Sequence, residues 1–114
     1  MKDDRIYLRH IVEAIEDIEK YTASGYAAFI CERMRQDAVI RKLEVIGEAV
    51  KQLSPAAKAT RVDIQWREIA AMRDKMIHEY FGVNLEIVWT AVEHSLPELK
   101  QAAEEILAAP QDIR

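Results

Sequence analysis

The sequence predicts an all-helical protein, an antiparallel bundle of four to six helices forming a single domain over residues 1–114. Only three glycines and three prolines interrupt its 114 residues. Apolar residues recur every three or four positions through long segments, as they do on one face of a helix. No segment of useful length alternates apolar and polar residues as a half-buried strand would. Short connections between long helices favour antiparallel neighbours.

The N-terminal half contains three predicted helices. Helical spacing of apolar residues predicts a helix over residues 3–21, a turn over 22–25 and a short helix over 26–34. The strongest pattern predicts a long helix over residues 35–53, whose opposite face is charged. The two longer apolar stripes consist of Tyr7, Leu8, Ile11, Ile15 and Ile18, and of Val39, Leu43, Ile46, Val50 and Leu53.

The next predicted helix covers residues 66–80. Ser54 and Pro55 end the long helix and provide an N-cap with a proline in the first turn, so residues 55–62 form a loop or a single helical turn. Asp63 is the expected cap of the helix that follows.

A last apolar pattern extends over residues 85–106. Gly82 is suited to the positive φ of a C-cap, and Asn84 to the N-cap of this final segment. Ser95 and Glu98 have the spacing of a capping box, and a proline lies between them. The pattern therefore predicts a kink or a restart of the helix near Ser95.

Composition excludes several classes of protein. Half of the residues are hydrophobic, which excludes a mainly disordered chain. The one cysteine, Cys31, has no partner for an internal disulfide, and no Cys/His cluster has zinc-site spacing. The charged N-terminus and the lack of any apolar run near ~20 residues indicate neither a signal peptide nor a membrane span. We expect a cytoplasmic protein that does not associate with membranes.

The net charge of -4 restricts how the chain would contact nucleic acid. Proteins that bind long nucleic acids tightly usually carry a basic surface. Any RNA contact is therefore expected to be local, short or made by a composite surface of two chains. An acidic protein is also suited to a basic partner.

Arg73 occupies an unexpected position in the helix predicted over residues 66–80. At ~100° per residue it falls near the middle of an apolar face that also carries Trp66, Ile69 and Ile77. Leaving a buried guanidinium unpaired costs several kcal/mol. Arg73 must therefore meet an acid, line a cleft or bind an anion such as phosphate, which matches its planar fork.

Three further polar residues surround Arg73 on the same helix. His78 lies about 140° around the helix from Arg73, so one straight helix does not bring the two together. Asp74 shares a face with His78, where it could fix the imidazole tautomer or raise its pKa. Tyr80, seven residues after Arg73, is predicted to lie on the same face of this helix as Arg73. Arg73 and His78 could converge if the helix end opens, or if two chains form one cleft.

These side chains are the parts that metal-independent RNA cleavage requires. A base removes the proton of the ribose 2′-hydroxyl, an acid protonates the leaving 5′-oxygen, and a cation stabilises the charge that develops on phosphorus. His78 suits proton transfer and Arg73 suits charge stabilisation, with no cofactor and no metal. A structural interpretation stands beside this one: a buried ion pair and a capping histidine.

Four segments together resemble the HepT-like members of the HEPN superfamily, over nearly the whole chain. They are RQDAVIRKLEVIGEA at residues 35–49, WREIAAMRD at 66–74, HEYFGV at 78–83 and IVW at 87–89. HepT-like proteins are bacterial and archaeal toxins paired with a small MntA-like nucleotidyltransferase antitoxin. The resemblance implies a HEPN-like bundle that forms a homodimer, with both Arg-x4-His motifs facing a shared cleft.

The resemblance also implies an activity. It indicates an endoribonuclease that cleaves mRNA or tRNA and leaves a cyclic phosphate, with Arg73 and His78 as the catalytic pair and Asp74 in support. The motif extends to His-x-Tyr, which identifies Tyr80 as the residue that an MntA-like partner would AMPylate. AMP beside Arg73 would fill the phosphate site and silence the nuclease.

Two alternatives remain open from the sequence. The chain could be a non-catalytic helical dimer that binds a nucleotide, or one that presents Tyr80 to a partner nucleotidyltransferase. Glu44 and Glu48, four residues apart, are best interpreted as part of a solvated face. The Gly-Glu-Ala pattern of the family that the chain resembles implies, as an alternative, that Glu48 supports the site. His10 and His94 have no ligand partner at metal spacing and are interpreted as surface or core residues.

Overall fold

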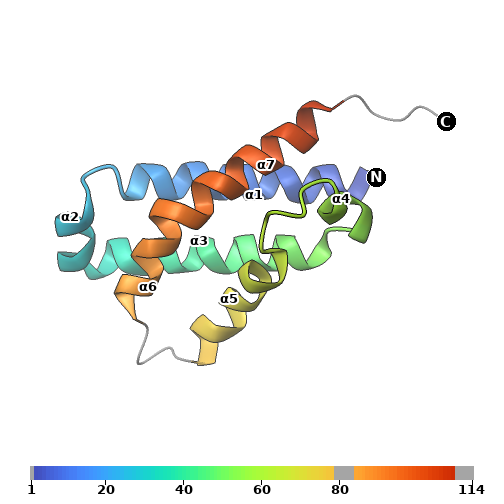
Figure 1. Cartoon of the computed structure of the whole chain (residues 1–114). Helices are drawn as coiled ribbons and strands as arrows, with labels where there is room; N and C mark the ends of the chain where they lie inside the picture. The colour runs from blue at the N-terminus through green and yellow to red at the C-terminus, as the bar shows by residue number, and fades with distance from the viewer. Residues whose placement is uncertain (1, 79–83, 110–114) are drawn as a thin grey trace.

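A computed structural model of the chain describes the backbone of residues 2–78 and 84–109, and the side chains of 4–72 and 84–109. Every regular element in these ranges is helical, which confirms the predicted all-α bundle (Figure 1). The elements are α1 (Lys2–Tyr21), α2 (Tyr26–Cys31), α3 (Arg33–Gln52), α4 (Pro55–Ala59), α5 (Trp66–His78), α6 (Leu85–Thr90), the π-helical turn η2 (Ala91–Ser95) and α7 (Leu96–Ala108).

Helices α1 and α3 form the centre of the bundle. They lie side by side and antiparallel, α7 crosses α1, and α5 packs against α3 (Figure 1). The predicted apolar stripes face this centre: Leu8, Ile11, Ile15 and Ile18 of α1 and Val39, Leu43, Ile46 and Val50 of α3 are all buried. Burial of each such side chain contributes roughly 1.5–3 kcal/mol, so these stripes dominate the stability of the pair.

Polar contacts fix how α1 and α3 lie relative to each other. The carboxylate of Asp4, only 6% exposed, accepts hydrogen bonds from the backbone N–H of Ser54 at 2.8 Å and from its hydroxyl at 2.6 Å. Nearer the other end, Lys42 Nζ lies 3.0 Å from Asp17 Oδ2. These contacts hold the two ends of α1 against α3 and against the residue that follows its C-cap, Ser54.

The short helix α2 closes one end of the bundle. Its Phe29 is fully buried and packs on Trp89 of α6 with ring centroids 5.3 Å apart, while Tyr26 meets the same indole edge-on at 5.4 Å. This aromatic cluster holds α6 against α2. The break between α2 and α3 falls at Glu32, three residues before the predicted start of the long helix.

Two predicted caps are confirmed. The hydroxyl of Ser54 accepts from the N–H of Ala57 at 3.1 Å with Pro55 in the first turn of α4. Of the two alternatives predicted for residues 55–62, a loop or a single helical turn, the structure thus shows the short helix. The side chain of Asn84 accepts from the N–H groups of Glu86 and Ile87 at the start of α6.

Two other predicted caps are wrong. Asp63 does not cap α5, because both of its carboxylate oxygens accept 2.9 Å hydrogen bonds from Arg61 and the helix begins only at Trp66. Ser95 has helical backbone angles and makes no capping hydrogen bond. Instead the chain accommodates the proline that follows through the π-helical turn η2, so the predicted irregularity occurs without a break.

Candidate functional site

Helix α5 carries the predicted catalytic residues in its C-terminal half. Arg73, Asp74 and His78 all lie within the continuous helix Trp66–His78. Tyr80, the predicted AMPylation site, lies outside the described residues. The described surroundings of these residues are the backbone of α5, the side chains of residues 66–72 and the neighbouring helices.

The first half of α5 shows which faces of the helix are buried. Trp66 and Ile69 are buried, whereas Arg67, Glu68 and Ala71 are exposed. This pattern agrees with the periodicity expected from the sequence.

Continuation of the same register separates Arg73 from His78. Arg73 follows Ile69 by four residues and therefore takes a position on the packed side of the helix. His78 follows Ala71 by seven residues and takes a position on the exposed side. A straight α5 keeps the two positions on different faces, as the sequence predicts.

The start of α5 is held by several contacts of its described residues. The indole N–H of Trp66 donates to the carbonyl oxygens of Lys58 at 3.1 Å and Arg61 at 3.0 Å. Arg61 also pairs with Asp63 and, across the fold, with Glu105 of α7 at 2.6 Å. The hydrogen bonds from Arg61 lower the pKa of the Asp63 carboxyl, and those carboxylates raise the pKa of the guanidinium. These hydrogen bonds and ion pairs hold the turn before α5, the helix that packs against α3.

A groove of about 550 Å³ lies between α5 and the α6–η2 segment. Its lining includes the apolar side chains of Ala71, Met72, Ile87 and Ala91 and polar residues, among them Glu68 and Glu86. Ile87 is about half exposed. From α5 the groove is lined by Glu68, Ala71 and Met72, which precede the segment that carries His78.

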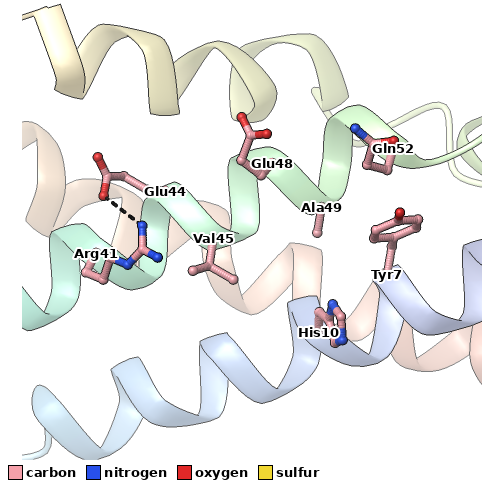
Figure 2. Close-up of a pocket in the computed structure, with 8 residues that line it drawn as sticks. All are labelled: Tyr7, His10, Arg41, Glu44, Val45, Glu48, Ala49 and Gln52. Carbon is pink, nitrogen blue, oxygen red and sulfur yellow. Dashed lines mark ion pairs between the residues drawn. The ribbon is translucent and has the colours of Figure 1, made fainter.

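A second cavity, of about 530 Å³, lies between α1 and α3. Tyr7 and His10 line it from α1, with their rings edge to face and their centroids 6.2 Å apart. Figure 2 shows them opposite Ala49 and Gln52 of α3, while Arg41, Glu44 and Glu48 line the cavity further along α3. This cavity could not be predicted from the sequence, because only the packing of α1 on α3 brings together residues as distant in the chain as Tyr7 and Ala49.

His10 and His94 are exposed, and so is Cys31. In the part of the chain that the structure describes, no three His, Cys, Asp or Glu side chains are arranged to hold a metal ion. No described helix is both long enough and apolar enough to cross a membrane.

Comparison with known proteins identifies relatives along nearly the whole chain. A protein of Thermococcus cleftensis that carries the name probable ribonuclease HepT is 46% identical over 88% of this chain and 92% of its own. A protein of Caldanaerobacter subterraneus, named as a candidate RNase, is 43% identical over 94% of this chain and 96% of its own.

A longer relative also aligns with the chain. It is a protein of Methanocaldococcus jannaschii named as a gamma-glutamylcyclotransferase and candidate RNase, 44% identical over 98% of this chain. The chain spans only half the length of that relative. No solved structure matches the chain. The family model described as Ribonuclease HepT-like matches residues 11–106, which include all of α5, and the chain belongs to this family.

Proposed function

We propose that the chain is the toxin of a toxin–antitoxin pair, a metal-independent endoribonuclease that cleaves mRNA or tRNA with Arg73 and His78. The observation that carries the proposal is the family match across α5, together with the register of that helix. A guanidinium position on the packed side and an imidazole position on the exposed side supply the cation and the proton carrier.

The proposed reaction proceeds by transesterification. A neutral His78 accepts the proton of a ribose 2′-hydroxyl, whose oxygen attacks the adjacent phosphorus. The bond from phosphorus to the 5′-oxygen breaks, and the leaving oxygen takes a proton from an imidazolium. The products are a 2′,3′-cyclic phosphate and a free 5′-hydroxyl. Arg73 neutralises the charge that develops on the phosphoryl oxygens, and Asp74 orients the imidazole.

Because one straight α5 separates Arg73 from His78, we propose that two chains build the site. A homodimer that brings two α5 helices together would present two guanidinium and two imidazole groups around one cleft. The groove beside α5, which apolar side chains including the half-exposed Ile87 line in part, offers a surface next to that cleft. A local composite site also suits a chain whose net charge is -4.

Regulation is proposed to occur at Tyr80. An MntA-like nucleotidyltransferase would transfer AMP from ATP to the phenolic oxygen and release pyrophosphate. Tyr80 follows Arg73 by seven residues in the sequence, so an attached AMP would compete with RNA phosphate for the guanidinium.

Cleavage of RNA by the purified chain tests the proposal. The wild-type protein should cut a labelled RNA in the presence of EDTA and leave a cyclic phosphate end. Arg73→Ala and His78→Ala should each lose roughly 10²-fold or more of the rate. Arg67→Ala, at an exposed arginine of the same helix, is the matched control and should retain activity. Equal RNA integrity with the wild type and both variants would exclude the nuclease and favour the non-catalytic alternative.

A further inference from the structure

The groove between α5 and the α6–η2 segment continues into a smaller cavity at the start of α5. This cavity has a volume of about 250 Å³ and is lined by residues 63–65, by the first half of α5, by Ser95 of η2 and by Glu98 of α7. The groove and the cavity share three lining residues, Glu68, Met72 and Ser95. They therefore form one continuous depression beside α5, which we call the α5 groove.

The lining of the α5 groove is acidic. Its charged residues in the described part of the chain are all carboxylates: Asp63, Glu68, Glu86 and Glu98. Arg61 neutralises Asp63 through two hydrogen bonds of 2.9 Å. The other three are exposed, and none of their side chains forms an ion pair or a hydrogen bond with another described residue. A cationic ligand would reduce the repulsion among these carboxylates, whereas the phosphates of RNA would add to it.

The same lining also exposes apolar surface. Ala71, Met72, Ile87 and Ala91 contribute to it. Ile87 is 48% exposed, although its neighbour Val88 in the same short helix is almost fully buried. Covering apolar surface is favourable by roughly 25 cal/mol per Å². A ligand that is only charged would leave this surface in water, so the groove is suited to a ligand that is both cationic and apolar.

The architecture restricts which peptide conformation the groove can bind. Every regular element in the residues that the structure describes is helical, so these residues offer no sheet edge for an extended strand. Polyproline segments bind grooves lined by aromatic rings, and none of the described lining residues is aromatic. An amphipathic helix, by contrast, inserts its apolar face into a groove and places its charged flanks at the rim.

We propose that the α5 groove binds a basic amphipathic helix of a partner protein. Apolar side chains of that helix cover Met72 and Ile87, and its lysine or arginine side chains pair with Glu68, Glu86 and Glu98. A second copy of this chain suits the groove less well, because its net charge is -4 and many of its cations already pair with its own acids. These cations are Arg35, Arg41, Lys42, Lys51, Arg61 and Lys100.

Peptide binding with charge reversal tests the electrostatic part of the proposal. The probe is a fluorescein-labelled synthetic helix of about 18 residues, with leucine on one face and lysine on its flanks, and fluorescence anisotropy measures its Kd. Glu68→Lys/Glu86→Lys should raise Kd roughly 10-fold or more. A second peptide, in which glutamate replaces lysine, should bind this variant more tightly than it binds the wild type.

The matched control for charge reversal is Glu13→Lys/Glu93→Lys, at two exposed acids outside the described lining. It changes the net charge by the same amount and should weaken binding of the lysine peptide far less. An equal loss of affinity in both double variants would reduce the effect to net charge and overturn the site. Circular dichroism of each variant should match the wild type.

Replacement of Ile87 tests the apolar part. Ile87→Ser should raise Kd roughly 5-fold or more, because the peptide then covers less apolar surface. Met34→Ser changes an exposed apolar side chain of α3 outside the described lining and should bind as the wild type does. In NMR spectra the peptide should shift the amide resonances of Met72, Ile87 and Ala91. Shifts confined to α1 and α3 would overturn the assignment.

Sedimentation of the chain without peptide distinguishes a partner helix from a second copy. Glu68→Lys/Glu86→Lys should keep the oligomeric state of the wild type. A changed state in this variant, absent from Glu13→Lys/Glu93→Lys, would assign the groove to a second copy and overturn the proposal. Failure of the lysine peptide to bind the wild type would also overturn it, whether or not the chain cuts RNA, because peptide binding requires no nuclease activity.

Discussion

Asp4, in the first turn of α1, accepts two hydrogen bonds from Ser54, which lies fifty residues later at the start of α4. The same Ser54 hydroxyl caps α4 by accepting from Ala57. One nearly buried carboxylate thus joins the N-terminus of the chain to the turn that leads into α5.

Replacement of Asp4 by alanine should destabilise the fold by about 1–3 kcal/mol, because the N–H and hydroxyl of Ser54 lose their acceptor in a partly buried place. Urea unfolding followed by circular dichroism measures this change. Glu13→Ala, at an exposed position of α1, is the control and should cost less than about 0.5 kcal/mol. Equal midpoints for the two variants would contradict a structural role for Asp4.

Trp66→Phe should separate the packing of α5 from its anchoring. Phenylalanine keeps an aromatic ring in the core but loses the N–H that donates to the carbonyl oxygens of Lys58 and Arg61. We expect a loss of about 1–2 kcal/mol in unfolding free energy. Hydrogen exchange should show faster opening of the first turn of α5 than of α1, and uniform acceleration across all helices would argue against a local anchor.

The pair of Arg61 and Asp63 should contribute to stability at neutral pH and not in acid. Arg61 lowers the pKa of Asp63 in the folded chain, so the unfolded chain binds the proton first as the pH falls. The contribution is present above the ordinary aspartate pKa and disappears as the pH falls through the lowered value. The difference in melting temperature between wild type and Asp63→Asn should therefore shrink in acid, and a constant difference would contradict this linkage.

Tyr80→Phe should separate nuclease activity from its control. Without the phenolic oxygen the chain cannot accept AMP, so incubation with a cognate nucleotidyltransferase and ATP should leave its intact mass unchanged. The wild type should gain whole AMP units and lose RNA cleavage. Tyr7→Phe, a matched change in α1, should behave as the wild type. A mass gain that persists in Tyr80→Phe would move the modification elsewhere.

Much of the fold could be predicted from the sequence, because helical periodicity is a local property. The stripes of α1 and α3 are buried where the spacing of apolar residues predicts. The caps at Ser54 and Asn84 are likewise confirmed, since each depends on a side chain and the N–H groups two or three residues later. Asp63 failed as a cap because a bidentate arginine two residues away competes for the same oxygens.

The candidate site was also predicted from the sequence only in part. The sequence by itself determined that Arg73 and His78 take different faces of one helix, since this follows from ~100° per residue. The burial of Trp66 and Ile69 and the exposure of Ala71 agree with that division. Only the tertiary structure decided that α3 is the neighbour of α5 and that a cavity opens between α1 and α3. The reason is physical: spacing along a chain fixes which side chains share a face, whereas the choice of which faces meet depends on packing between distant segments.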